Sequence, residues 1–183
     1  MKKSVLIGLL AGISLFSFSQ NEATSLKKSI TSVDLDILAP EVSYERHLKG
    51  LFTLKSALAF GYSFGQSIFS NGTYFILTPI LISEPRYYYN FTHRIEKGKK
   101  TSYNASEYFA LTASYAADIV IKSDSGSVRG GDPEFSLIPK LGFKRTVGRK
   151  FFFEVSSGIG VSFRKNKNSG AYGIDLRFGY NIK

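Results

Sequence analysis

The C-terminal stretch of the chain reads Tyr172-Gly-Ile-Asp-Leu-Arg-Phe-Gly-Tyr-Asn-Ile182, and it alternates between large apolar residues and residues that are small, polar or charged. Because successive side chains of a β-strand point to opposite faces, this segment predicts a strand with one wholly apolar face and one face that carries Asp175 and Arg177. Its length is about what a tilted strand needs to cross a lipid bilayer. The stretch therefore predicts a strand of a transmembrane barrel, with its apolar face toward lipid and its polar face toward the lumen.

The same alternation recurs in five further segments toward the N-terminus. Each is predicted to be a strand with its large apolar residues toward lipid and the residues of the other parity, Tyr108 among them, toward the lumen. In the segment Tyr74–Phe91, the facing follows from Glu84, Arg86, Tyr88 and Asn90, which share one parity and are assigned to the lumen. From the C-terminal side, the outward residues are Phe153, Val155, Ile159, Val161 and Phe163; Phe135, Leu137, Pro139, Leu141 and Phe143; Phe109, Leu111, Ala113, Tyr115, Ala117, Ile119 and Ile121; Phe75, Leu77, Leu81, Tyr87 and Tyr89; and Phe52, Leu54, Leu58, Phe60, Tyr62 and Phe64.

The segment Ser32–Leu48 does not keep one period. Apolar residues alternate with acids up to Ile37, but after Ala39-Pro40 their parity switches. Either Leu38–Glu41 is a tight hairpin, or a proline or bulge kinks one strand there. Single-chain bacterial barrels carry an even number of strands, and six strands are predicted after residue 50. The hairpin brings the total to eight, so the predicted fold class is all-β, an eight-stranded antiparallel up-and-down transmembrane β-barrel.

The N-terminus is typical of a secretory signal. Lys2 and Lys3 precede an uncharged run, and Ser17 and Ser19 provide the small residues that a signal peptidase reads before its cut. The apolar run is too short for a comfortable membrane-spanning helix. The interpretation is a cleaved signal peptide at residues 1–19, an N-terminal segment at 20–29 and a single barrel domain at 30–183.

The composition agrees with a barrel but does not by itself decide between a membrane and a soluble one. The 183 residues include 17 Gly, 16 Phe and 11 Tyr, with no Trp and no Cys, and the formal net charge is +10. The absence of cysteine excludes disulfides, a lipoprotein anchor and thiolate metal sites. A chain of this length suits one domain.

The polar faces of the predicted strands carry charges of both signs. An eight-stranded barrel is just wide enough for side chains to fill its interior, and an unpaired buried charge is costly. The expectation is therefore a lumen charge network. An alternative is a narrow pathway for water, ions or a small solute, lined by Glu45, Glu84 and Arg86. The expected network consists of Glu45, Lys55, Glu84, Arg86, Asp118, Lys140, Glu154, Asp175 and Arg177.

Two motifs add a resemblance to this pattern. With the signal and the two-faced strands, the run Pro40-Glu-Val-Ser-Tyr-Glu-Arg46 resembles the small outer-membrane β-barrel proteins of Gram-negative bacteria, of the OmpA/OmpX transmembrane type. The run Glu84-Pro-Arg-Tyr-Tyr-Tyr-Asn90 looks like one in uncharacterised members of that group. These barrels usually end in an aromatic residue used for assembly, whereas this chain ends Ile182-Lys183. The resemblance is one of architecture, which carries function poorly.

The resemblance implies a location and a set of partners. The location would be the outer membrane of a Gram-negative bacterium, and the partners would be outer-membrane lipid, lipopolysaccharide and the barrel-assembly machinery. Arginine and lysine suit charge-assisted contacts with phosphates. The expected lipopolysaccharide contacts, all near the predicted outer loops, are Lys122, Arg129, Arg164, Lys165 and Lys167.

A structural or interaction protein is expected rather than an enzyme. His47 and His93 are the only histidines, and neither has a serine fixed beside it by a recognisable motif. No metal, other cofactor or nucleic acid is expected, and the basic run Arg94–Lys100 is interpreted as a solvated turn. The remaining rival is a secreted lipocalin-like binder of apolar ligands, which has the same period with the apolar set turned inward.

Overall fold

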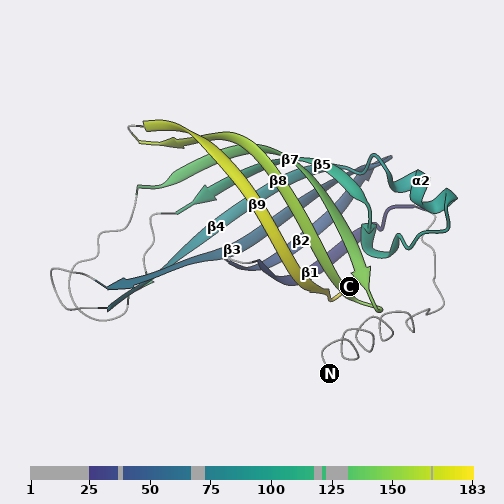
Figure 1. The fold of residues 1–183 in the computed structure, drawn as a ribbon, viewed down its shortest axis with the longest axis horizontal. Coiled ribbons are helices and arrows are strands. Elements are labelled where there is room, and N and C mark those ends of the chain that lie inside the picture. The colour runs from purple at the N-terminus through teal and green to yellow at the C-terminus, as the bar shows by residue number, and fades with distance from the viewer. Residues whose placement is uncertain (1–24, 37–38, 67–72, 118–120, 123–131, 166) are drawn as a thin grey trace, which may run out of the picture.

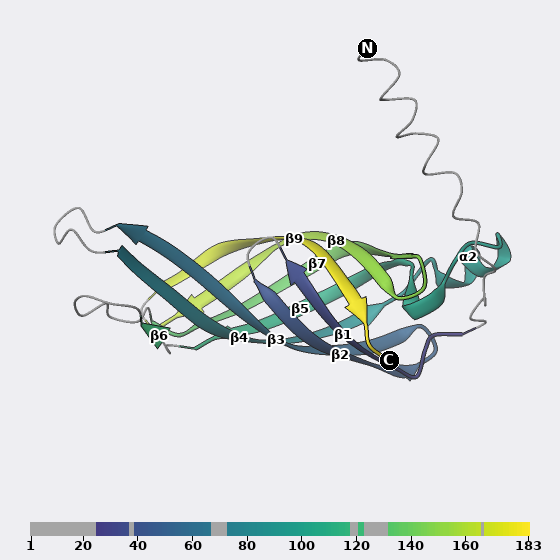
Figure 2. The same cartoon turned by 90° about the horizontal axis from the view of Figure 1, so that it is seen from below.

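The computed structural model describes residues 25–36, 39–66, 73–117, 121–122, 132–165 and 167–183. Most of these residues lie in antiparallel strands that wrap into one barrel, seen from two sides in Figure 1 and Figure 2. The strands are β1 (Ser29–Asp36), β2 (Pro40–Lys49), β3 (Phe52–Gln66), β4 (Thr73–Tyr87), β5 (Glu107–Ala116), β6 (Ile121–Lys122), β7 (Glu134–Val147), β8 (Phe151–Arg164) and β9 (Lys167–Asn181).

The strands follow one another around the barrel in an up-and-down topology. Their order in the sheet is β3-β2-β1-β9-β8-β7-β5-β4-β6, and an additional pairing of β3 with β4 closes the ring. The two-residue β6 pairs with β4, as β5 does, so β5 and β6 are two parts of one position in the wall. The barrel therefore has eight strand positions, and the predicted fold class is confirmed.

The first two strands form a hairpin, not one kinked strand. Val33 pairs with Val42 and Leu35 with Pro40, and the amide of Asp36 donates to the carbonyl of Ala39 at 3.1 Å. The parity of the apolar residues switches because the chain turns back on itself. Residues 37–38 are outside the described part of the chain, and Pro40 and Glu41 belong to β2 and not to the turn as predicted.

The β1–β2 hairpin is short compared with its neighbours. β1 has 8 residues and β2 has 10, whereas β3 and β9 each have 15. The seam that closes the barrel pairs Ser32–Asp36 of β1 with Arg177–Asn181 of β9, and Thr31 adds backbone hydrogen bonds to Ile182 and Lys183. Beyond this hairpin, β3 and β9 diverge (Figure 1).

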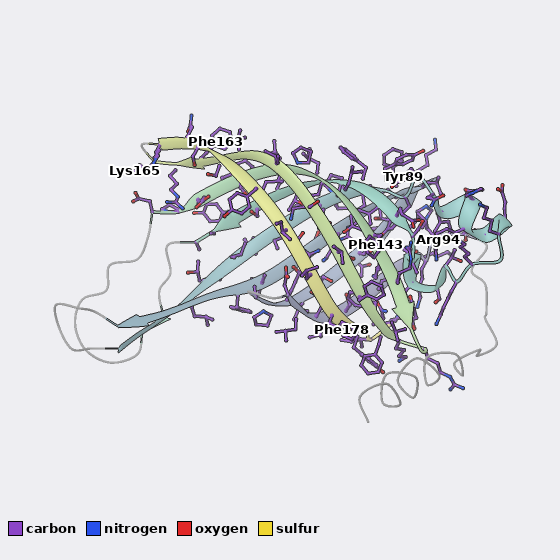
Figure 3. All side chains as sticks on the ribbon, in the orientation of Figure 1. Tyr89, Arg94, Phe143, Phe163, Lys165 and Phe178 are labelled. Atoms are coloured by element: carbon purple, nitrogen blue, oxygen red, sulfur yellow. The ribbon has the colours of Figure 1, made fainter. Side chains whose placement is uncertain are left out.

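The apolar faces point out of the barrel and the charged faces point into it. On β9, Ile174 and Phe178 are 67% and 61% exposed, whereas Arg177 between them is 3% exposed. Figure 3 shows Phe163 and Phe178 on the outer surface of the barrel. The same division holds on the described parts of the long strands, which bury their polar face and expose large apolar side chains. The facing follows from the period of two in each strand.

A structured connection covers one end of the barrel, where the sequence predicted only a turn. It runs from β4 to β5 and contains α2 (Phe91–Glu96) and the 3-10 turn η2 (Ser102–Asn104), at the end where the C-terminus lies (Figure 1). Phe91 packs with Leu26, Tyr88 and Tyr108 in a buried apolar cluster. Among the described residues, no helix is long and apolar enough to cross a membrane. We call this connection, residues 88–106, the cap.

The prediction that the basic run Arg94–Lys100 is a solvated turn is wrong for Arg94. Its side chain is buried, and it donates to the carbonyls of Ala105 and Lys100 at 3.0 Å each. Burial and then the nearby charge of Arg145 lower the pKa of Arg94. Figure 3 shows it against the base of the cap. Lys97 and Lys99 are exposed, so the prediction holds for those two residues.

Candidate functional site

Arg86 lies in the lumen, where it joins two walls of the barrel. It comes from β4, and its Nη2 and Nη1 donate to Oε1 and Oε2 of Glu154 on β8 at 2.8 and 3.1 Å. Its Nε donates to Oε1 of Glu84 at 2.6 Å. The three side chains are at most 2% exposed. A bidentate arginine–carboxylate pair is strong and geometrically specific, so this contact fixes β4 relative to β8.

Arg177 on β9 shares the same carboxylate. Its Nη1 donates to Oε1 of Glu154 at 2.7 Å. Its Nη2 lies 3.4 Å from Oδ1 of Asp175, and its Nε lies 3.9 Å from Oε2 of Glu41 on β2. Glu154 is therefore the acid on which two buried arginines converge.

Two lysines extend the network along the walls. Nζ of Lys55 lies 2.5 Å from Oε1 of Glu41. Nζ of Lys140 donates to Oδ2 of Asp175 at 2.7 Å, and that oxygen also accepts a hydrogen bond from Ser156. Charges taken out of water need close partners and further hydrogen bonds to offset their desolvation. Asp175 has both, whereas Oε1 of Glu41 and Nε of Arg177 have ion-pair partners but no hydrogen bond among the described residues.

Two tyrosines complete the network, and the sequence had assigned them only to the inner face. The hydroxyl of Tyr108 donates to Oε1 of Glu154 at 3.0 Å, and that of Tyr88 donates to Oε1 of Glu45 at 2.9 Å. The guanidinium carbon of Arg86 lies 4.3 Å from the centre of the Tyr108 ring, which adds a cation–π contact. Both tyrosines are fully buried.

Asn104 connects the cap to the charge network. Its Nδ2 donates to Oε1 of Glu45 at 2.8 Å, and its Oδ1 accepts the amide of Lys27 at 2.8 Å. Its φ of 60° is left-handed, a conformation that asparagine adopts more readily than most residues. The cap thus reaches Glu45 through both Tyr88 and Asn104. Sequence periodicity had no means to find Asn104, because η2 has no strand period.

We expect Asn104→Ala to loosen the cap without unfolding the barrel. Losing its hydrogen bond leaves part of the buried Glu45 carboxylate unsatisfied, at a cost of about 1–3 kcal/mol. Hydrogen exchange followed by mass spectrometry should show faster exchange in residues 88–106 and unchanged protection in the strands. Asn104→Gly also removes the side chain, but glycine tolerates the left-handed backbone conformation. If the effect comes from the lost side chain, Asn104→Gly should therefore speed exchange in the cap as Asn104→Ala does.

Ser102→Ala is the matched control for the cap, because the hydroxyl of Ser102 has no hydrogen-bond partner among the described residues. It should leave exchange unchanged. Equal exchange in all three variants would contradict the role assigned to Asn104.

The structure brings together most of the predicted network. Glu154, Glu84 and Arg177 join Arg86 through the contacts described above, and Nη1 of Arg86 also lies 3.8 Å from Oε2 of Glu45. Lys140 and Asp175 form a pair that Arg177 joins to the rest, and Lys55 joins through Glu41. Asp118 lies outside the described residues. The site residues that the prediction omitted are Glu41, Tyr88, Asn104, Tyr108, Thr112 and Ser156.

The predicted lipopolysaccharide contacts gather at the end opposite the cap. Arg164 pairs with Glu134, with Nε 2.8 Å from Oε2. Lys165 and Lys167 are exposed beside it at the β8–β9 connection (Figure 3 labels Lys165). Lys122 lies in β6, and Arg129 is outside the described residues. This connection is short, because β8 ends at Arg164 and β9 begins at Lys167.

The lumen beyond the Lys140–Asp175 pair has a different lining. Ala57, Ile82, Ser114 and Ser136 are successive cross-strand partners, and such partners share one face of a sheet. Ala57 faces inward, so the others do too. Ile80, Ile82, Ala116, Ser114 and Ser136 are only partly buried, unlike the sealed charge network. We call this inward-facing region, lined by Ala57, Ala59, Ile80, Ile82, Ser114, Ala116, Ser136 and Ile138, the outer lumen.

The described residues offer few groups for catalysis or metal binding. Nε2 of His47 donates to the carbonyl of Gly50 at 2.9 Å, and Nδ1 of His93 lies 3.5 Å from Oε2 of Glu96 on the cap. No cluster of three or more histidine, aspartate or glutamate side chains suited to a metal ion occurs in the parts of the chain that the structure describes. The contacts that the structure describes among the charged residues of the lumen are ion pairs and hydrogen bonds.

Comparison with known proteins gives no match. Neither the known protein families, nor the curated proteins, nor the solved structures contain one that matches this chain.

Proposed function

We propose that this chain is an integral outer-membrane β-barrel protein of structural or interaction type, whose lumen is closed by its charge network. The observation that carries the proposal is the facing of the strands. Large apolar side chains on the outer surface include Leu35, Leu81, Leu141, Ile159 and Tyr172, which are 59–81% exposed. Water-soluble monomers rarely expose a contiguous apolar band of this kind, whereas a membrane barrel requires one.

The aromatic residues at the end near the cap support the same orientation in a membrane. Phe52 and Tyr87 contact each other, with ring centres 4.8 Å apart, and Phe151 and Tyr180 do so at 5.2 Å. All four are more than a third exposed. Aromatic side chains gather where membrane barrels meet the headgroups. With the cap and the C-terminus on the periplasmic side, the opposite end would face outward.

A lipocalin-like binder of apolar ligands is supported less well. Such a protein needs an apolar interior, but the charge network occupies the interior near the cap. A narrow channel is also supported less well, because Arg86 and Glu154 bridge the lumen directly and are nearly inaccessible to solvent. A bilayer containing the protein should accordingly remain electrically silent.

The proposed partners follow from the location. Lys165 and Lys167 are exposed at the outward end and would contact lipopolysaccharide phosphates. Arg164 is partly neutralised by Glu134, so it would contribute less. Insertion would require the barrel-assembly machinery, and no catalytic activity is proposed.

The first test is the mobility of the purified protein on an SDS gel, with and without boiling. A folded membrane barrel resists SDS until it is heated, so two positions are expected. The sample should come from the detergent-solubilised outer-membrane fraction of the expressing bacterium. Recovery in a soluble periplasmic or secreted fraction, with a single mobility, would contradict the proposal.

A further inference from the structure

The short β1–β2 hairpin leaves two strand edges unpaired in the wall of the barrel. Glu41 of β2 pairs with Ala59, and the described part of β3 beyond it, Phe60–Gln66, pairs only with β4. Asp36 of β1 pairs with Arg177, and its Oδ1 accepts the amide of Leu176 at 3.0 Å; within the described part of the chain, the strand partner of Lys167–Asp175 on β9 is β8 alone. We call the opening between these two edges the lateral gap. Where β1 and β2 are present they lie between β3 and β9, so three strand spacings separate β3 from β9. At ~4.8 Å per spacing, the lateral gap is roughly 14 Å wide.

The lateral gap opens within the apolar outer surface, not at its rim. Tyr172 and Ile174 on the β9 edge are 81% and 67% exposed. Leu35, on the hairpin just below the gap, is 62% exposed. On the next strand, apolar outward residues continue as far as Phe163, well beyond the end of the hairpin. If the apolar surface lies in a membrane, the gap faces the hydrocarbon.

Behind the gap lies the outer lumen, whose lining combines small or branched apolar side chains on β3 and β4 with the cross-strand serines Ser114, Ser136 and Ser162. Ala59 and Ile80 pair directly beside the β3 edge. Gly173, on the β9 edge, has no side chain, and a Cβ there would lie 2.7 Å from Cε of Lys140. The stem of Lys140 therefore covers this part of the wall, and its ammonium group is held by Asp175 at 2.7 Å. The floor of the outer lumen is thus a neutralised ion pair, and its walls suit a hydrocarbon chain.

We propose that the lateral gap admits the acyl chain of an amphiphilic lipid from the surrounding leaflet into the outer lumen. Backbone N–H and C=O groups at membrane depth need hydrogen-bond partners, and the ester, amide or hydroxyl groups of such a lipid provide both donors and acceptors for the two edges. The charge network below closes the lumen, so the chain enters and leaves by the same gap. The region is then a lipid-binding site and not a route across the membrane. This inference rests on the proposed membrane location.

The absence of tryptophan from the chain allows a direct test. Single-tryptophan variants are reconstituted in phosphatidylcholine vesicles with or without bromine on the acyl chains. Ile82→Trp places the fluorophore in the outer lumen, with Ile80→Trp as a second position should the first fail to fold. Leu81→Trp, on the outer surface beside it, is the positive control. Phe152→Trp, 2% exposed inside the sealed half, is the negative control.

The expected result is that brominated lipid quenches Ile82→Trp to an extent similar to Leu81→Trp, while aqueous iodide quenches it weakly. Phe152→Trp should respond to neither quencher. Quenching of Ile82→Trp by iodide alone would overturn the proposal in favour of a water-filled outer lumen. Quenching by neither would overturn it in favour of an outer lumen closed by protein, including a strand of a partner protein. If Leu81→Trp itself escapes brominated lipid, the membrane location fails instead.

Discussion

Replacing Glu154 by leucine should lower the free energy of unfolding by roughly 3–5 kcal/mol, the cost of breaking a buried ion pair by removing one partner. Glu154 accepts hydrogen bonds from Arg86, Arg177 and Tyr108. In this variant Arg86 and Arg177 remain buried in the barrel but no longer have the carboxylate to which both donate. The measurement is urea unfolding of the protein in lipid vesicles, followed by the heat-dependent mobility shift or by circular dichroism.

Glu134→Leu provides the matched control. Glu134 pairs with Arg164 at the exposed end of the barrel, with both side chains partly in contact with solvent. Exposed pairs contribute about 0–1 kcal/mol, so this variant should unfold close to the wild type. A double variant, Arg86→Met with Glu154→Leu, should lose less stability than the sum of the losses in the two single variants. When both side chains are replaced, neither charge of this pair remains buried without the other. Equal losses for Glu154→Leu and Glu134→Leu would refute the role assigned to the network.

The second large effect expected is at Leu81, near the middle of β4 and 59% exposed on the outer surface. In a bilayer, Leu81→Arg places a charge near the midplane, at a cost of about 2–4 kcal/mol. In water, the same substitution on an exposed side chain would change stability by no more than about 0.5 kcal/mol. Urea unfolding in vesicles measures the difference, and a negligible loss would argue for a water-soluble barrel.

Thr92→Arg is the control for this substitution. Thr92 is an exposed residue of α2 in the cap, beyond the end of the strands. An arginine there meets water or headgroups in either environment, so stability should hardly change. If Leu81→Arg lowers the free energy of unfolding and Thr92→Arg does not, the loss is therefore due to lipid contact and not to a general effect of added charge.

The strands could be predicted from sequence because each long strand keeps a period of two over many residues. In β9, a single parity assigns both the exposed Phe178 and the buried Arg177 correctly. The β1–β2 hairpin was harder, because a turn and a kink produce the same switch of parity. The register between paired strands, such as the pairing of Val33 with Val42, distinguishes the two and is absent from the sequence alone.

The candidate site could be predicted only in part, because its contacts also depend on how distant strands are arranged. Parity identifies which charges face inward, but it does not say which of them meet across the lumen. Arg86 and Glu154 are 68 residues apart and come from strands that are not neighbours in the wall. Tyr108 was placed on the inner face, yet its hydroxyl contact depends on the same cross-lumen geometry. The cap was missed because α2 and η2 are short and follow no strand period.

The seam between β1 and β9 also bears on how the barrel forms. It joins Ser32–Asp36 to Arg177–Asn181, whereas β3 and β4 pair along the whole of Phe52–Gln66 and Thr73–Tyr87. The long hairpins need only local loop closure, but the seam brings together residues from nearly opposite ends of the chain, which costs more entropy and is slower. We expect the hairpins to assemble first and the seam last. The step that completes the barrel then depends on a strand contact much shorter than those within the long hairpins, because β8 and β9 also pair along most of their length.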